Sequence, residues 1–322
     1  MSIVSDVKER GMDAVRRWAL ELDGVEPTLA QPDPAGLPAD ALLTLADRVR
    51  RWHEVQRPTD ILLEVEPGVT LERRWVPLDI VGIYVPRGLI STLVMCAVPA
   101  QVAGVRRLVV CTPPAGAPLV AAAAELLGVD EVWALGGPQA IGFLAYVERV
   151  DKIVGPGNAY VNDAKLEVSR DVAIDLPGGP SEVVVVGGDA RIAELELAAQ
   201  REHGHDAVCA RVDTLEEAET IAPEHLVLLG DVERQVHDVR NAGAVFVGEW
   251  SPVAAGDYAT GGNHVLPTNG WARSIGGLGL ETFLKPITVQ RLTRDGLELV
   301  RPVVEALATA EGMPAHADAM RR

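Results

Sequence analysis

The chain has 322 residues, of which 48% are hydrophobic, enough to bury a substantial core and to form two domains. Its formal net charge of −17 and pI near 4.8 argue against nucleic acid and anionic membranes as partners, because their phosphates would be repelled. No apolar run approaches the length of a membrane span, and residues 1–10 lack the apolar core of a signal peptide, so we expect a cytoplasmic protein.

The first 80 residues combine helical spacing with one alternating stretch. Apolar residues recur at helical intervals over residues 3–22 and 42–55, and a proline-rich loop at 31–38 separates the two runs. Residues 61–76 alternate between apolar and polar side chains and predict a β-hairpin that turns at Pro67-Gly68.

From residue 80 onward, short β-branched runs alternate with helical runs. The expected strands are 81–85, 108–111, 131–135, 152–154 and 172–176, followed by 182–186, 207–212, 226–229 and 244–247. Nearly continuous apolar strands separated by helices are typical of parallel sheets covered on both faces. We therefore predict an α/β fold of two Rossmann-like parallel-sheet units that lack the GxGxxG fingerprint, with a small helical tail at the C-terminus.

Three glycine-rich turns follow expected strands, at 136–139, 155–158 and 177–181. The carboxyl ends of parallel strands are the usual place for a ligand, and helix N-termini there can hold phosphate. Each turn by itself is equally typical of an ordinary tight turn.

The stretch from Gln200 to His203 ends an expected amphipathic helix. These two residues are three positions apart, so they share a helix face, and an amide oxygen with an imidazole nitrogen forms half of a metal site. Asp257, in the glycine-rich loop 248–280, can complete a zinc or manganese set, although a lone loop aspartate is more often a cap or a turn residue.

Glu224 and His225 precede an expected strand and could transfer protons as a pair. Spacing alone favours a solvated pair at the end of a loop. Hydrolase classes fail on motif grounds, because neither HExxH nor GxSxG occurs. The three cysteines show no CxxC spacing and are expected to be buried free thiols.

Eight segments together resemble the motif series of the histidinol dehydrogenase family, in the family's order and over nearly the whole chain. The segments are 153–161, 175–183, 200–204, 222–226, 256–258, 263–268, 283–285 and 310–317. The resemblance implies an enzyme that oxidises L-histidinol through L-histidinal to L-histidine and reduces two NAD, with one Zn²⁺ per subunit.

The resemblance also implies a role for each matching residue. The implied zinc ligands are Gln200, His203, Asp257 and His316. The implied catalytic residues are His225, as general base, and Glu224, which activates water. Substrate contacts fall on Ser181, His264 and Glu311, and NAD contacts on Tyr84, Gln139 and Asn158.

In the family, tail positions reach the active site of the other subunit, which implies a homodimer with shared active sites. We expect residues 1–85 and 181–280 to form an α/β domain with the metal site, residues 86–180 to form a second on the NAD side, and 281–322 to form an exchanged helical tail.

The chain departs from the family pattern at two places. Only 20 residues separate His203 from Glu224, where the family has a longer insertion, and Arg87 to Ser91 replaces a Gly-Gly-Lys turn. A paralogue acting on another small polar or amino alcohol, and a non-catalytic homologue, are therefore the alternatives. His264 and Glu311 favour histidinol.

Overall fold

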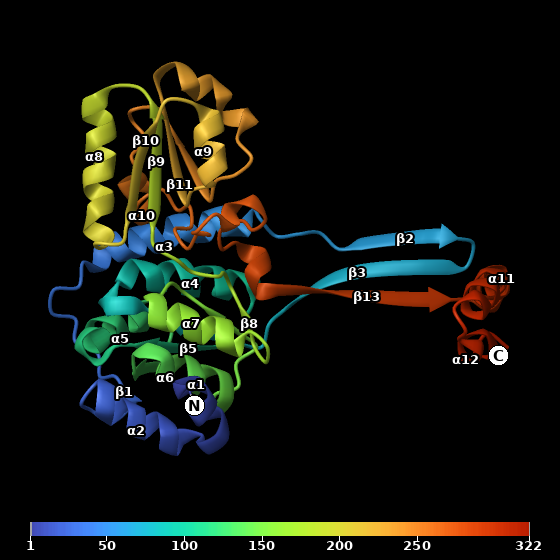
Figure 1. Cartoon of the computed structure of the whole chain (residues 1–322). Helices are drawn as coiled ribbons and strands as arrows, with labels where there is room; N and C mark the ends of the chain where they lie inside the picture. The colour runs from blue at the N-terminus through green and yellow to red at the C-terminus, as the bar shows by residue number, and fades with distance from the viewer. Residues whose placement is uncertain (1, 322) are drawn as a thin grey trace. The chain divides into compact units, whose positions relative to one another are not determined.

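The computed structural model describes residues 2–321 and contains two compact units (Figure 1). The larger comprises Met1–Arg57 and Leu78–Phe283, and the smaller comprises Pro58–Pro77 and Leu284–Arg322. Among the described residues, no helix combines the length and apolarity needed to cross a bilayer.

The first sheet of the larger unit has six strands in the order β1-β6-β5-β4-β7-β8. Their bounds are Thr28–Leu29 (β1), Ile80–Tyr84 (β4), Arg107–Thr112 (β5), Val132–Ala134 (β6), Lys152–Val154 (β7) and Ala173–Ile174 (β8). All neighbours pair in parallel except β1, which runs antiparallel to β6. Because β4 lies between β5 and β7, strand order reverses beside it, and the carboxyl end there is the expected ligand position.

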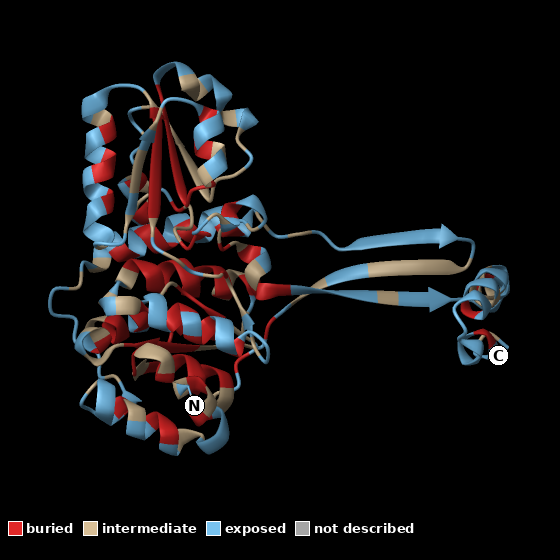
Figure 2. Cartoon of the chain, in the orientation of Figure 1, coloured by how far each residue is buried: buried red, intermediate tan, exposed pale blue. Residues whose placement is uncertain are grey.

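Helices cover both faces of this sheet (Figure 1). They are Ile3–Arg10 (α1), Met12–Leu22 (α2), Ala39–Glu54 (α3), Ile90–Ala103 (α4), Ala117–Leu126 (α5), Gly137–Gly142 (α6) and Ala159–Val168 (α7). Most of α4 is buried, in keeping with its apolar sequence (Figure 2). The single helix expected over 3–22 is divided at Gly11, whose φ of 58° interrupts the helix.

The second sheet has four parallel strands in the order β10-β9-β11-β12. Their bounds are Glu182–Gly187 (β9), Val208–Val212 (β10), His225–Leu229 (β11) and Ala244–Val247 (β12). Alternate residues of β9 face opposite sides: Val183 and Val185 pack against Ala190–Gln200 (α8), and Val184 and Val186 against Leu215–Ile221 (α9). Each sheet face therefore has its own apolar core, as a parallel sheet requires.

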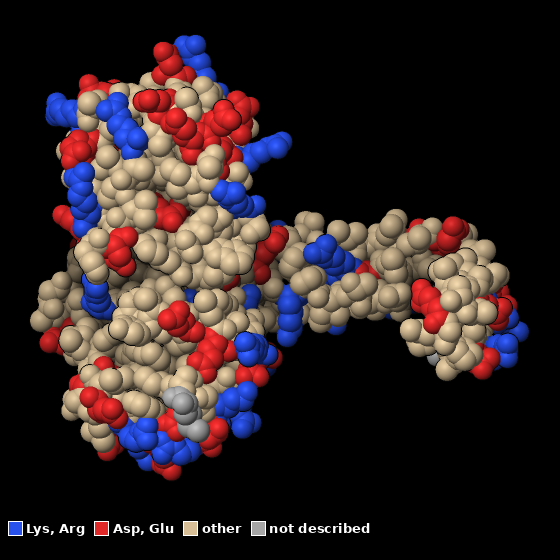
Figure 3. Space-filling view, viewed as in Figure 1, with Lys and Arg blue, Asp and Glu red and all other residues tan. Residues whose placement is uncertain are grey.

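Charges of both signs are interspersed on the face that Figure 3 shows, and the basic side chains there form no continuous patch. The three cysteines carry free thiols; Cys96 and Cys111 are buried as expected from the sequence, whereas Cys209 is only partly buried.

The smaller unit is a three-stranded antiparallel sheet in the order β13-β3-β2, with two helices. The elements are Ile61–Glu66 (β2), Val69–Pro77 (β3), Leu284–Leu292 (β13), Arg294–Ala310 (α11) and Pro314–Asp318 (α12). The hairpin predicted over 61–76 is confirmed.

The α/β fold with parallel-sheet units is confirmed, but the expected domain bounds differ from the structure. Residues 1–85 do not join 181–280 in one domain, because β1 and β4 pair within the first sheet and β2 and β3 belong to the smaller unit. The tail expected to be helical from 281 includes β13, which begins at Leu284. Pro286 within this strand and its short apolar alternation explain why no strand is expected there. In the loop 248–280 a short helix forms, Val253–Tyr258 (α10).

A buried ion pair holds the glycine turn that follows β7. Lys165 Nζ donates to Asp175 Oδ1 at 2.5 Å and to the Gly155 carbonyl at 2.8 Å, and Asp175 Oδ2 accepts the Gly155 amide at 2.7 Å. The two side chains are only 3% and 1% exposed. Gly155 itself has a φ of 106°, and a Cβ there would lie 2.2 Å from the Tyr84 carbonyl oxygen.

We expect Lys165→Met to lower the free energy of unfolding by about 3–5 kcal/mol, because it leaves the Asp175 charge buried without a cation. Urea unfolding followed by circular dichroism measures the loss, and Lys165→Met/Asp175→Leu should recover part of it. Lys8→Met is the control, because its pair with Asp171 is exposed and should contribute no more than about 1 kcal/mol. An equal loss in the Lys165 and Lys8 variants would contradict the assignment.

Candidate active site

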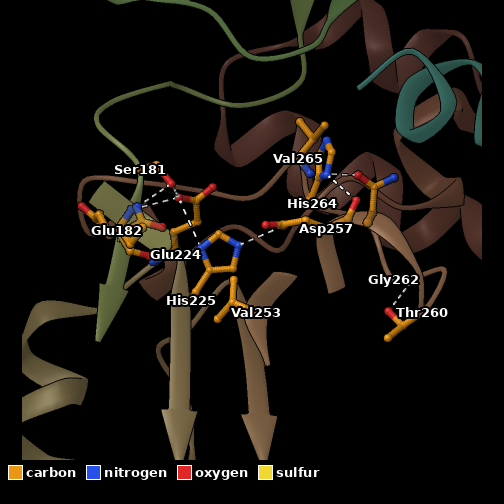
Figure 4. A network of polar contacts seen from close by, with 12 residues as sticks. Ser181, Glu182, Glu224, His225, Val253, Asp257, Thr260, Gly262, His264 and Val265 are labelled. Atoms are coloured by element: carbon orange, nitrogen blue, oxygen red, sulfur yellow. Dashed lines mark hydrogen bonds and ion pairs between the residues drawn. The ribbon is translucent and has the colours of Figure 1, made fainter. Parts of the chain in front are cut away.

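Four polar side chains gather at the amino ends of β9 and β11 (Figure 4). Because His225 pairs with Val183 in the parallel ladder, Glu224 lies beside Glu182, and Ser181 immediately precedes it. Glu182, Glu224 and His225 are all buried. The structure therefore brings together the three sequence-predicted residues Ser181, Glu224 and His225.

The carboxylate of Glu224 is held on one side. Its Oε2 accepts the Ser181 hydroxyl at 2.6 Å and the Glu182 amide at 3.0 Å. Burial raises the pKa of Glu224 to about 7, against the opposing effect of the hydrogen bond from Ser181. A carboxyl group with that pKa can both accept and release a proton near neutral pH.

Main-chain contact selects the tautomer of His225. Nδ1 lies 3.1 Å from the Glu182 carbonyl oxygen, which can only accept, so Nδ1 carries the proton. Nε2 is buried and has no hydrogen-bond partner within residues 2–321. Burial lowers the pKa of the imidazole, which leaves Nε2 as an available base atom.

Gln200, Asp257 and His203 surround this pair. Gln200, at the end of α8, donates through Nε2 to the Ser181 hydroxyl at 2.9 Å, which leaves its Oε1 as a potential ligand atom. Asp257, on α10, has Oδ1 3.8 Å from His225 Nε2. His203 follows α8 in a 3-10 turn and is exposed; proximity to it adds to the lowering of the His225 pKa, of which burial is the main cause.

His264 lies across the same cavity, of about 180 Å³, which His225 and Asp257 also line. Its Nδ1 is 3.1 Å from the Asp257 carbonyl oxygen, and its Nε2 is 3.4 Å from Thr92 Oγ1 on α4. Burial lowers the pKa of His264 to about 4, so the ring is neutral. Contact with α4 places the site between the second sheet and the first turn of a helix that follows β4.

The composition of the site fits a divalent cation. Three buried carboxylates, Glu182, Glu224 and Asp257, make no ion pair with lysine or arginine in the described part of the chain. Burial raises the pKa of Asp257 to about 6, and no side chain among the described residues donates a hydrogen bond to its carboxylate. Among residues 2–321, no three His, Cys, Asp or Glu side chains cluster as a metal site by themselves, so an amide such as Gln200 would have to contribute.

The residues predicted to contact NAD lie at a different place, the carboxyl edge of the first sheet. The Tyr84 hydroxyl accepts the Gly137 amide at 3.2 Å, and Gln139 Nε2 donates to Asp23 at 3.0 Å while its Oε1 is buried without a described partner. Asn158 is exposed and caps α7 through the Val161 amide.

Glu311 and His316 belong to the smaller unit, where both are exposed. Neither Thr92 nor Glu182 was predicted from the sequence as a site residue. Glu182 carried one signal, a charged residue at the head of an apolar strand, whereas nothing near Thr92 distinguished it from an ordinary helical threonine.

Comparisons with known proteins identify one family over nearly the whole chain. The family model described as histidinol dehydrogenase matches residues 1–220 and 213–322. The chain is 38% identical to histidinol dehydrogenase of Methanosarcina barkeri, covering 99% of this chain and 90% of the relative, and 37% identical to that of Photobacterium profundum, covering 98% and 86%. The crystal structure of histidinol dehydrogenase from Elizabethkingia anophelis matches with a TM-score of 0.88 at 30% identity, covering 99% and 90%.

The alignment with the Methanosarcina barkeri protein extends over 392 residues, so at least 70 positions (392 − 322) have no counterpart in this chain. The two segments matched by the family model meet at 213–220, where α9 connects β10 to β11. The fold persists on both sides of this junction. The chain therefore belongs to the histidinol dehydrogenase family and is an NAD-dependent oxidoreductase of histidine biosynthesis.

Proposed function

We propose that the enzyme oxidises L-histidinol to L-histidine in two successive steps, each reducing one NAD, with Zn²⁺ bound at the site. The observation that carries this proposal is the pairing of a neutral imidazole, His225, with a carboxyl group of raised pKa, Glu224, on adjacent residues of one buried strand end. Two oxidations need two proton acceptors with different targets, and this pair supplies them.

In the first step, His225 Nε2 removes the hydroxyl proton of histidinol while the carbon that bears this hydroxyl gives a hydride to NAD⁺. The products are histidinal, NADH and a proton. Nδ1 keeps its own proton because it donates to the Glu182 carbonyl, so the imidazolium that forms is held in one orientation.

In the second step, water adds to the aldehyde carbon and Glu224 takes a proton from that water. The hydrate then loses a hydride to a second NAD⁺, which yields histidine as the carboxylate, NADH and two protons, one of them on Glu224. Ser181 and the Glu182 amide both bind Oε2 of Glu224, so Oε1 is the atom left to face the water.

Gln200, His203 and Asp257 would hold the zinc, with His316 as the fourth ligand. Gln200 fits because Ser181 occupies its amide nitrogen and leaves the oxygen free, and Asp257 fits because its buried carboxylate has no described hydrogen-bond donor. When bound, zinc would orient the amino alcohol and polarise its hydroxyl oxygen.

For the substrate we propose contacts from Ser181, His264 and Glu311. For NAD we propose Tyr84, Gln139 and Asn158, since all three lie at the carboxyl edge of the first sheet, the usual position for a dinucleotide in such folds. We also propose a cytoplasmic location.

The surface of the smaller unit supports a homodimer in which each tail completes the other subunit's site. Leu299, Val303 and Leu307 are four residues apart on α11, share one helix face, and are each about half exposed or more. On β2, the four residues Ile61, Leu62, Leu63 and Val65 are also exposed. Exposed apolar side chains at helical spacing on one face of α11 are typical of surfaces that subunit interfaces cover.

The direct test supplies purified protein with zinc, NAD and L-histidinol and follows NADH and histidine together. We expect two NADH for each histidine formed and one zinc per subunit by elemental analysis. Chelation of the metal should abolish turnover, and added zinc should restore it. Turnover only with other amino alcohols would show that histidinol is not the substrate, and bound zinc without any turnover would contradict the enzymatic role.

The division of roles predicts that two adjacent substitutions differ. Glu224→Gln should slow histidinal oxidation by roughly 10²- to 10⁴-fold, as expected for loss of a general base, while leaving histidinol oxidation much less affected. His225→Ala should impair histidinol oxidation severely. Each half-reaction is measured separately by starting from histidinol or from histidinal. Equal impairment of both steps by Glu224→Gln would show that the roles are assigned wrongly.

Shared sites predict complementation between inactive variants. His316→Ala and Gln200→Ala homodimers should each lack activity. Mixing them under conditions that exchange subunits should form heterodimers. Each heterodimer has one intact site, which is half the number in a wild-type dimer. Activity that stays at background, although native mass spectrometry detects heterodimers, would place both ligands in the same chain.

A further inference from the structure

Besides the hydrogen bonds of the strand ladder, four hydrogen bonds within the described residues involve Glu182, and three of them join it to the two proposed proton acceptors (Figure 4). Its amide donates to Glu224 Oε2 at 3.0 Å, and its carbonyl accepts from His225 Nδ1 at 3.1 Å. Its own carboxylate accepts the Glu224 amide through Oε2 at 3.1 Å and the Asn269 amide through Oε1 at 2.8 Å. Glu182 and Glu224 thus exchange amide-to-carboxylate hydrogen bonds reciprocally.

The backbone amides of Glu224 and Asn269 both need a hydrogen-bond acceptor at this position. Glu224 directly precedes β11, and Asn269 lies in a loop with a φ of 56°, a left-handed conformation that asparagine tolerates. A buried amide without an acceptor costs about 1–3 kcal/mol. One carboxylate supplies an oxygen to each amide, which a neutral amide side chain cannot do because it has a single acceptor oxygen.

Burial of the Glu182 carboxylate lowers the stability of the fold. Glu182 is 6% exposed and has no cationic partner in the described residues, and burial raises its pKa despite the two amide donors. A fold under no functional constraint could cross-link the same strands with neutral groups at lower desolvation cost. Features of this kind gather at functional sites, where the geometry they impose is used.

We propose that Glu182 is a positioning residue for both oxidation steps. Its carboxylate anchors the chain on either side of the site, at Glu224 and Asn269, so that its own peptide groups set the carboxylate of Glu224 and the tautomer of His225. Glu182 touches neither substrate nor cofactor in this role. The inference rests on the proposed functions of Glu224 and His225.

The test is Glu182→Gln in the full-length, zinc-loaded enzyme. Because the glutamine can satisfy one amide but presents its NH₂ group to the other, Glu224 and His225 should shift. We expect kcat to fall roughly 10- to 100-fold in both half-reactions, as for small misplacements of reacting groups, with KM for histidinol changed less than about threefold.

A second measurement separates positioning from general stability. ¹⁵N spectra of histidine-labelled protein distinguish protonated from unprotonated ring nitrogens, and His225 should change from a single Nδ1–H tautomer to a mixture in Glu182→Gln. The control is Glu219→Gln, because Glu219 also binds two backbone amides, those of Arg240 and Asn241, from α9 in the same sheet unit, but accepts both through Oε1, which glutamine retains. It should leave kcat and the His225 spectrum unchanged.

Wild-type kcat in Glu182→Gln, or reduced kcat with an unchanged His225 spectrum, would each overturn the proposal. If Glu182→Gln does not fold, Glu182→Asp keeps the charge but is one methylene shorter, so it should show the same two changes. If the wild-type enzyme fails to oxidise histidinol, the proposed function fails, while the His225 spectra still decide the positioning role.

Discussion

The parallel pairing of β9 with β11 is the constraint on which the site depends. In a parallel pair the amino ends of both strands lie at the same edge, so the residues that begin them become neighbours although more than 40 positions separate them in sequence. At this edge the ladder has ended and peptide groups need other partners. Side chains of Glu182 and Glu224 supply them, and the same hydrogen bonds orient Glu224 and His225.

Buried negative charge is the second consequence of this arrangement. Glu182, Glu224 and Asp257 lie near one another without a basic side chain paired to them in the described structure, and burial raises the pKa of each. Backbone amides and a hydroxyl offset part of the cost for Glu182 and Glu224. Asp257 has no such donor, so its ionisation depends on a cation more than that of the other two.

Much of the fold could be predicted from local patterns, whereas the site could be predicted only in part, because spacing alone favours a solvated pair at Glu224 and His225, which are buried. Alternating β-branched and helical runs indicate parallel sheets, and the spacing of Gln200 and His203 places two donors on one helix face. Glu182 was not predictable in this way, because its partners Glu224 and Asn269 become neighbours only through strand pairing and loop course. Thr92 depends likewise on packing between α4 and the loop that carries His264. The strand β13 was missed because Pro286 interrupts its sequence and its apolar alternation is short.

The position of the site explains why a shortened connection can leave it intact. α9 returns from the carboxyl end of β10 to the amino end of β11, and its seven residues span ~10 Å against ~16 Å for the five-residue strand. Ala222, in a left-handed conformation, and Pro223 cover the remaining distance to Glu224. The length of this crossover is therefore close to the minimum for a connection between two parallel strands of one sheet. Insertions or deletions in the middle of this connection change the part of the unit that lies away from the site. Glu224 and His225 remain fixed by β9 at the amino end of the sheet.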